Sequence, residues 1–280
     1  MYYFLLSLAA ILFASQFLFN QRFQDEYGDT AYSALLFTGY TSLISFFVML
    51  AIGGFNMRIS LFSLATAIVY SLVNISYTYV SIKAFATVNL SVYSVFAMLG
   101  GMLLPFLYGL VFEHEALTSG KILSCLLIAF SLSLTISRDS RRGGFIYYLL
   151  VFLLNGLCGV LSAFHQANPD AVSSTDFMAL NRLTAFVMCL LIWAVFFRKP
   201  LKLNAKGLLY SVGFALFCGF GNLIALISLK HLPASVQYPI ITGGVMSVSL
   251  VISVIRHENV TRKNIISAIC AFAATIFAAI

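Results

Sequence analysis

The segment His114-Glu115-Ala116-Leu117-Thr118 recurs as His257-Glu258-Asn259-Val260-Thr261, 143 positions later (257 − 114), about half of the chain. The same offset joins Gly100-Gly101 to Gly243-Gly244, Ile122 to Ile265 and Ser124 to Ser267. These matches lie in very apolar sequence, so each copy covers a pair of helices and the loop between them. An internal repeat of this kind in a membrane protein is typical of transporters.

Composition places the chain in a lipid bilayer. Hydrophobic residues make up 61% of the sequence and charged residues 9%, with a mean hydropathy of +0.99. A water-soluble domain carries about 25% charged residues. Because a membrane-spanning helix needs about 20 apolar residues, the chain has room for about ten helices with short loops. We expect helices at residues 2–20, 32–52, 61–82, 88–110, 121–137, 145–166, 177–197, 207–229, 234–255 and 263–280.

The repeat and the helix count together predict an inverted duplication. Residues 1–138 and 145–280 are expected to form two repeats of five helices, joined by a short basic linker. Because five is odd, the second copy enters the membrane upside down, with a pseudo-two-fold axis in the membrane plane. Such a molecule has two nearly equivalent packings, with its cavity open to opposite sides. We therefore predict an all-α integral membrane protein of ten transmembrane helices in a 5+5 inverted repeat.

Several segments resemble the EamA-type branch of the drug/metabolite transporter superfamily. They are Phe13-Ala14-Ser15-Gln16-Phe17, residues 77–83, Gly100-Gly101 and Glu115-Ala116-Leu117-Thr118, then residues 226–235, residues 238–244 and Glu258. Their order covers the whole chain. The resemblance implies a multi-pass protein of the cytoplasmic (inner) cell membrane, with helices 1–4 and 6–9 around a central cavity and helices 5 and 10 outside it. The family's usual Trp in the first helix is Phe13 here, which leaves the role of that Trp open.

Polar side chains inside the expected spans indicate a binding site, because an unpaired amide in hydrocarbon costs several kcal/mol. The fifth and tenth helices carry no amide or charge within their apolar stretches. The alternative for each amide is a hydrogen bond that only holds helices together, worth about 0.6 kcal/mol. The predicted substrate-binding residues are Gln16, Asn74, Tyr77, Tyr93, Asn155, Asn181, Arg182, Asn222, Gln237 and Tyr238.

Arg182 is the only charge well inside an expected span. Its side chain either extends to the lipid headgroups or points into the cavity, where it binds a carboxylate or phosphate of a substrate. The roughly equivalent position of the first repeat is Tyr40 (182 − 142). A single charge away from the axis would favour one orientation of the substrate.

Glycine and proline in the fourth and ninth helices indicate moving parts. Paired glycines let helix backbones approach closely, and a proline permits a kink because it removes a backbone donor. Static packing is the alternative. The predicted hinge or gating residues are Gly100, Gly101, Pro105, Pro239, Gly243 and Gly244.

Patterns for other protein classes are absent. Thr118 and Thr261 stand where the second histidine of a zinc-protease H-E-x-x-H motif would be. The five cysteines occur singly, without metal-ligand or redox spacing. We expect no enzymatic activity, no metal and no cofactor. The formal charge of +7 reflects membrane-flanking Lys and Arg rather than nucleic-acid binding.

The nine acidic residues all lie in loops or at span edges, so no intramembrane carboxylate is available to exchange a proton for substrate. We predict a transporter of a small polar metabolite, neutral, zwitterionic or anionic, that works by alternating access. A flippase or carrier of a lipid-linked or amphiphilic substrate comes second, and an intramembrane enzyme or structural protein third. The expected partners are a small-molecule substrate and the lipid bilayer, with no nucleic acid, and the protein is expected to be a monomer or weak homodimer.

Basic residues give a prediction of orientation. Twelve of the sixteen lie at odd-numbered connections, whereas the even-numbered connections hold only Arg58, Lys121 and Lys230. The positive-inside rule therefore places the odd connections in the cytoplasm and both termini outside, although the family commonly has both termini inside. The first apolar segment has no Lys or Arg before it, so we expect it to stay as a helix rather than to be cleaved as a signal peptide.

Overall fold

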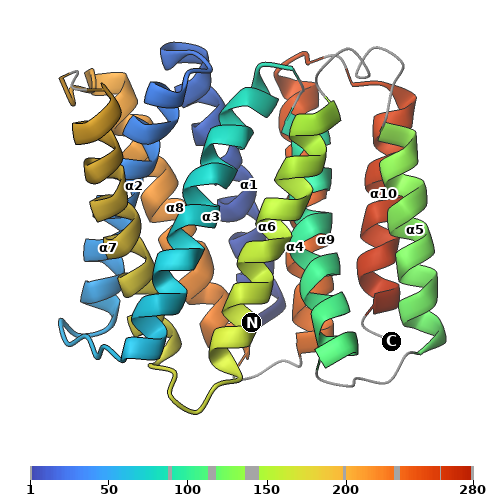
Figure 1. Cartoon of the computed structure of the whole chain (residues 1–280). Helices are drawn as coiled ribbons and strands as arrows, with labels where there is room; N and C mark the ends of the chain where they lie inside the picture. The colour runs from blue at the N-terminus through green and yellow to red at the C-terminus, as the bar shows by residue number, and fades with distance from the viewer. Residues whose placement is uncertain are drawn as a thin grey trace.

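A computed structural model describes residues 2–87, 90–112, 118–135, 145–197, 200–229, 234–258 and 260–278. The regular structure in these residues is helical (Figure 1). The elements are α1 (Tyr2–Tyr27), α2 (Ala31–Ile52), α3 (Leu61–Phe85), α4 (Leu90–Phe112), α5 (Ser119–Thr135), α6 (Phe145–Gln166), α7 (Ser174–Ile192), the π-helix η2 (Trp193–Phe197), α8 (Ala205–Leu229), α9 (Ala234–Ile255) and α10 (Arg262–Ala278).

Length and composition identify membrane spans among these helices. Within the described residues, six helices are long and apolar enough to cross a membrane: α1, α2, α3, α6, α7 with η2, and α8. Shorter apolar stretches at residues 92–105, 122–131 and 241–255 lie in α4, α5 and α9. The expected all-helical, multi-pass membrane fold is confirmed.

Three of the helices begin at hydroxyl caps in short loops. Thr30, Ser60 and Ser173 precede α2, α3 and α7, and each side-chain oxygen accepts from the backbone N–H three residues later, at 3.1 Å. Such a cap satisfies one of the donors that the first turn leaves without a helical partner.

The first helix is longer than the sequence predicts. We expected it to end near residue 20, but α1 continues to Tyr27. The extra turns are polar, and they find partners in the second half of the chain: Gln21 contacts Glu258, and Tyr27 donates to the side chain of Asn204. The apolar run therefore predicts too short a length for α1, because the last turns of this helix are held by hydrogen bonds rather than by lipid.

Helices of one half pack mainly on helices of the other half. Helix α1 lies against α8 and α9, α4 against α6 and α9, and α2 against α7 and α8. Exchanging α1–α5 with α6–α10 turns the α1–α8 contact into α6–α3 and the α4–α6 contact into α9–α1, and both of these pairs are also in contact. This correspondence is the one that an inverted repeat requires. The boundaries of the two repeats stay a prediction.

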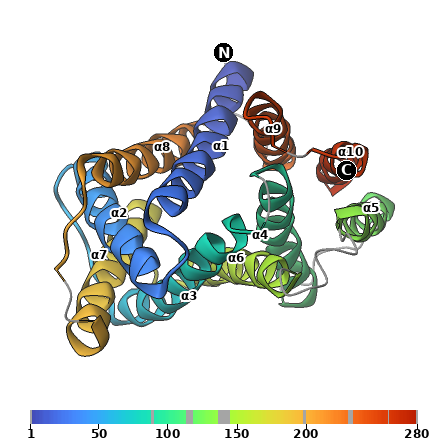
Figure 2. The ribbon, with the colours of Figure 1, turned by 90° about the horizontal axis from the view of Figure 1, so that it is seen from above.

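The α5–α10 pair lies at one side of the bundle, away from the ring that the other helices form (Figure 2). Helix α5 packs mainly on α10, whereas α10 also packs against α9. Ser131 Oγ donates to the Ser267 carbonyl and Ser267 Oγ to the Ser131 carbonyl, each at 2.9 Å. Exposed Leu126 and Ile269 give the pair an apolar outer surface, suited to lipid.

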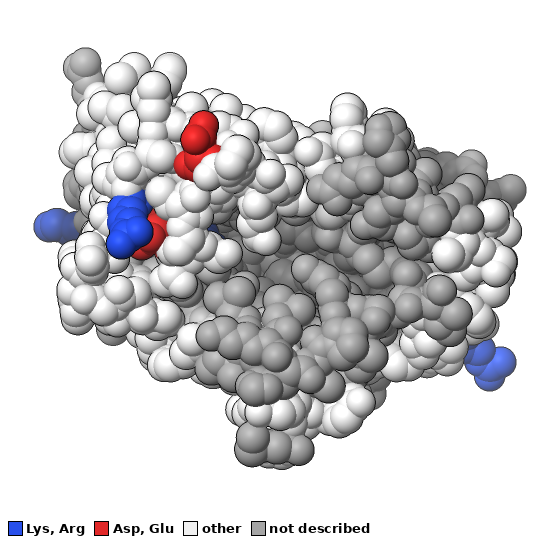
Figure 3. All heavy atoms as spheres, turned by 90° about the horizontal axis from the view of Figure 1, so that it is seen from below, with Lys and Arg blue, Asp and Glu red and all other residues white. Residues whose placement is uncertain are grey.

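The helices alternate in direction, so the bundle has two distinct ends. The odd-numbered helices end at the upper side of Figure 1, which we call the odd face, and the even-numbered helices end at the lower side, the even face. Figure 3 shows the even face, where few of the described charged side chains lie. The ion pairs of the described residues, Lys83–Asp29, Lys206–Glu26, Arg256–Asp25 and Arg256–Glu258, all lie at the odd face.

We predict that the odd face is cytoplasmic, because most of the basic residues lie there. In a background without native cysteines, Lys202→Cys should resist a membrane-impermeant thiol reagent added to intact cells. Arg58→Cys is the matched control, since both side chains are exposed but Arg58 lies at the even face. It should label readily. Labelling of Lys202→Cys with protection of Arg58→Cys would show that the orientation is the reverse.

Candidate functional site

A cavity of about 350 Å³ lies between the two halves. Its described lining comes from α1, α2, α3, α4, α6, α7, α8 and α9, and includes no residue of α5 or α10. The cavity therefore lies where the resemblance implied it, among these lining helices, which form a ring in Figure 2. Seven of the predicted site residues line it: Gln16, Asn74, Tyr77, Tyr93, Asn155, Arg182 and Asn222.

The other three predicted site residues do not take part in the described wall. Asn181 is buried, and its carbonyl accepts from Ser71 of α3 at 3.0 Å, so it belongs to the α3–α7 contact. Consecutive residues of a helix point about 100° apart, so Asn181 does not share the orientation of Arg182. The backbone of Gln237, Tyr238 and the hinge candidate Pro239 is in α9, but their side chains lie outside the described part of the chain.

Sequence reasoning missed several polar residues of the wall. Thr38, Thr41 and Thr78 line the cavity, and each hydroxyl donates to the carbonyl four residues earlier in its own helix, at 2.7 to 3.0 Å. A threonine whose hydroxyl bonds its own helix is indistinguishable in sequence from one that faces lipid. Asn20 was findable, because it lies four residues after Gln16, on the same side of α1.

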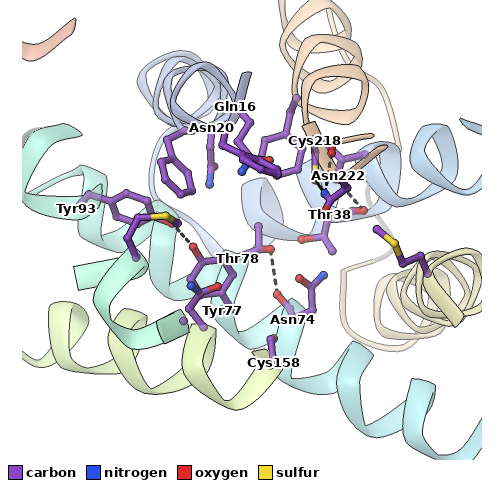
Figure 4. A pocket seen from close by; sticks show the side chains of 18 of the residues that line it. Gln16, Asn20, Thr38, Asn74, Tyr77, Thr78, Tyr93, Cys158, Cys218 and Asn222 are labelled. Atoms are coloured by element: carbon purple, nitrogen blue, oxygen red, sulfur yellow. Dashed lines mark hydrogen bonds between the residues drawn. The ribbon is translucent and has the colours of Figure 1, made fainter. Parts of the chain in front are cut away.

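The wall at α1 carries amide oxygens for which the described part of the chain supplies no hydrogen-bond partner. Gln16 is 9% exposed and Asn20 4%, and these atoms are Gln16 Oε1 and Asn20 Oδ1. A buried polar atom left in this way costs about 1–3 kcal/mol. Figure 4 shows both side chains directed from α1 toward the cavity, facing Tyr77 and Thr78 of α3. Such a wall suits a polar ligand better than an apolar one.

A chain of hydroxyl groups fixes the donor and acceptor roles on the α3–α4 side. Ser81 Oγ donates to the Tyr77 carbonyl at 2.7 Å, so it accepts from Tyr93 Oη, 2.9 Å away. Tyr93 Oη in turn accepts from Tyr77 Oη at 2.7 Å (Figure 4). Because the Tyr77 proton is used in this chain, the lone pairs of Tyr77 Oη are what it offers to a ligand. Tyr77 is thus an acceptor in the cavity.

Arg182 supplies the positive charge of the cavity. It lies eight residues after Ser174, about 12 Å along α7 from the start of the helix. Arg182 lines the cavity together with Tyr70, Cys158 and Cys218. None of the ion pairs found in the described residues includes Arg182. A position on the cavity wall favours a role in binding over extension to the lipid headgroups.

Comparison with known proteins gives the family. The EamA-like transporter family matches residues 144–280. Over these residues the chain belongs to the EamA-like transporter family. No curated protein matches the sequence. A crystal structure of another protein matches along 98% of this chain and 95% of its own length, with a TM-score of 0.62 and 17% identity. That likeness concerns the fold alone, and it extends over both halves.

The paired glycines of α4 and α9 lie at close helix contacts. A Cβ on Gly100 would overlap the carbonyl oxygen of Phe152 in α6, and one on Gly156 would come within 2.6 Å of the Gly100 carbonyl. In α9, a Cβ on Gly243 would overlap the Phe272 ring, and one on Gly244 would lie 2.7 Å from Ala10 Cβ. The glycines let α4 approach α6, and α9 approach α10 and α1. Their predicted role as hinges stays a prediction.

Two other candidate residues, Asn155 and Pro105, belong to the same α4–α6 contact. Asn155 Nδ2 donates to the Ala97 carbonyl at 2.7 Å, and a Cβ on Gly101 would lie 2.7 Å from that Nδ2. Pro105 packs closely against Gly159 of α6, because a Cβ on Gly159 would overlap the proline ring. Asn155 therefore joins two helices and lines the cavity at the same time.

Proposed function

We propose that this EamA-like transporter carries a small polar metabolite with a carboxylate or phosphate group across the membrane by alternating access. The observation that supports this most is Arg182, a cation on the cavity wall outside every ion pair found in the described residues. A guanidinium binds two oxygens of one carboxylate or phosphate in a planar fork. The substrate's anionic group would complete that pairing.

The rest of the wall supports a small substrate with further polar groups. The cavity volume of about 350 Å³ is at the lower end of the range of about 300–1,000 Å³ for small-molecule sites. Gln16, Asn20, Tyr77 and Asn222 offer amide and hydroxyl groups, whereas Phe13 and Phe214 offer aromatic surface. This combination suits a zwitterionic or anionic metabolite with a short apolar part.

The described cavity wall includes no Asp or Glu. A carboxylate that exchanges a proton for a cationic substrate is therefore not part of our proposal. Facilitated diffusion or exchange of one metabolite for another needs only that the loaded cavity can open to either side.

A lipid-linked substrate is the second candidate, and one feature favours it. An apolar groove of about 200 Å³ lies between α2 and α7, lined by Leu35, Gly39, Leu43, Phe186 and Leu190 among others. It could hold an acyl chain. However, the groove shares no described lining residue with the polar cavity, and α2 separates the two. A polar metabolite therefore remains our first choice.

A thermal-shift screen of the purified transporter tests the proposal. A ligand at 100 times its Kd stabilises the folded state by about 2.7 kcal/mol, which raises the melting temperature. We expect carboxylate- or phosphate-bearing metabolites to do this in the parent but not in Arg182→Gln. Hits are then tested by counterflow in proteoliposomes. Stabilisation by cations or lipid-linked compounds alone, or equal shifts in Arg182→Gln, would contradict the proposal.

A further inference from the structure

Beyond the end of α9, the chain turns back toward the first half of the protein. His257 adopts a left-handed conformation, with φ of 53°. The N–H of His257 donates to the Val254 carbonyl and that of Glu258 to the Ser253 carbonyl, each at 3.0 Å. This pair of bonds is the Schellman ending of a helix, in which glycine usually holds the left-handed position. A non-glycine residue in this conformation is uncommon and often marks a functional segment.

Glu258 joins three helices through one carboxylate. Its Oε2 accepts from the backbone N–H of Leu90, the first residue of α4, at 2.9 Å. Its Oε1 accepts from Gln21 Nε2 of α1 at 3.3 Å. The first turn of a helix has N–H groups without helical partners and a positive dipole end, so a carboxylate binds there well. A residue that follows α9 thus caps α4 and holds α1.

Arg256 completes the cluster from the same turn. Its Nη1 lies 3.1 Å from Glu258 Oε1 and also donates to Gln21 Oε1, while Nη2 pairs with Asp25 at 3.4 Å. The Glu258 side chain is 13% exposed and that of Arg256 20%. Hydrogen bonds between charged groups that are mostly shielded from water are stronger than surface ion pairs. The cluster therefore holds α1, α4 and α9 together at the odd face.

The cluster lies next to residues at the odd-face end of the cavity. Gln21 directly follows Asn20, and Leu90 lies three residues before Tyr93, and both Asn20 and Tyr93 line the cavity. Leu90 itself is fully buried. Since α1, α4 and α9 all contribute to the cavity wall, separation of these helix ends would widen the cavity toward the odd face. That separation breaks the Glu258 contacts with Leu90 and Gln21.

We propose that Glu258 is a gating residue. Its carboxylate keeps the odd face closed in the described state, and its contacts with Leu90 and Gln21 break when the cavity opens there. This rests on the proposed alternating-access function. The counterpart of Glu258 in the first copy is Glu115, which lies outside the described residues.

Cys218 provides the test, because it lines the cavity. With the other four cysteines replaced by alanine, a membrane-impermeant thiol reagent applied at the odd face reports whether the cavity is open there. The side from which Lys202→Cys labels identifies the odd face. We expect Glu258→Gln to raise the Cys218 labelling rate about 10-fold, because a neutral amide loses the ion pair and one of its two acceptors.

Glu26→Gln is the matched control, since Glu26 is another acid at the odd face but pairs at 3.7 Å with a Lys206 side chain that is 68% exposed. Its labelling rate should stay within about 2-fold of the parent. Gln21→Ala removes the Gln21 contacts with Glu258 and Arg256 and should raise the labelling rate about 3-fold. This variant provides the test if Glu258→Gln does not fold. A parental Cys218 labelling rate in a folded Glu258→Gln or Gln21→Ala variant would overturn the proposal. No substrate is needed, so a failed transport assay would contradict the proposed function but leave the gating result standing.

Discussion

Arg182→Gln is expected to lower uptake of an anionic substrate by at least about 100-fold, because two charge-assisted hydrogen bonds are each worth about 1.5–3 kcal/mol. The variant should still insert and fold, since removing a charge from membrane depth does not by itself destabilise a helix. Arg182→Lys should retain only weak binding, because an ammonium is a point charge without the planar fork.

Uptake or counterflow in proteoliposomes, at equal reconstitution of each protein, measures this effect. Arg58→Gln is the control, because Arg58 is an exposed cation in the α2–α3 connection, remote from the cavity lining. It should transport like the parent. If Arg58→Gln and Arg182→Gln both transport at parental rates, Arg182 does not bind substrate and only extends toward the headgroups.

Gly100→Ala is expected to destabilise the protein strongly. The new Cβ would overlap the Phe152 carbonyl oxygen and lie 2.7 Å from Phe152 Cα. A backbone cannot rotate away as a side chain can, so α4 and α6 must move apart. Overpacking costs about 1–3 kcal/mol, and we expect a value at the upper end. The melting temperature should fall by several degrees, and the fraction of detergent-stable protein should fall with it.

Gly39→Ala is the matched substitution. A Cβ on Gly39 would lie 3.7 Å from Cys189 Cβ, an ordinary contact, so only the helix propensity changes. Alanine is favoured over glycine in a helix by about 0.5–1 kcal/mol. Gly39→Ala should therefore melt at or slightly above the parental temperature. A Gly100→Ala protein with parental melting but altered transport would show that Gly100 serves as a hinge rather than as a packing position.

The fold could be predicted from sequence because the bilayer limits the possibilities. Long apolar runs separated by short polar segments have one solution in lipid, a helical bundle, and the repeat supplied its symmetry. The ends of helices were less predictable. The last turns of α1 are polar, and they stay helical because Gln21 and Tyr27 bond to residues more than 170 positions away. Sequence periodicity gives no information on such distant partners.

The candidate site was predictable where a residue is costly to bury. Amides and Arg182 were found because hydrocarbon tolerates them poorly. The direction in which a side chain points was not predictable in every case: Asn181 and Arg182 are neighbours, but only Arg182 lines the cavity. Glu258 was conspicuous as part of the repeat, yet its function could not be inferred, because its main partner is the backbone N–H of Leu90, which any residue type at that position except proline would supply.

The interleaving of the halves has a consequence for how the protein is made. Helices α1 to α5 contact one another sparsely, and their main partners, α6 to α10, are synthesised later. The hydrogen-bond partner of Ser131 on α5 lies 136 residues further along, on α10. Neither half can therefore mature as a separate folding unit during translation. The early helices must remain in the bilayer, loosely associated, until the ribosome has delivered the helices that enclose them.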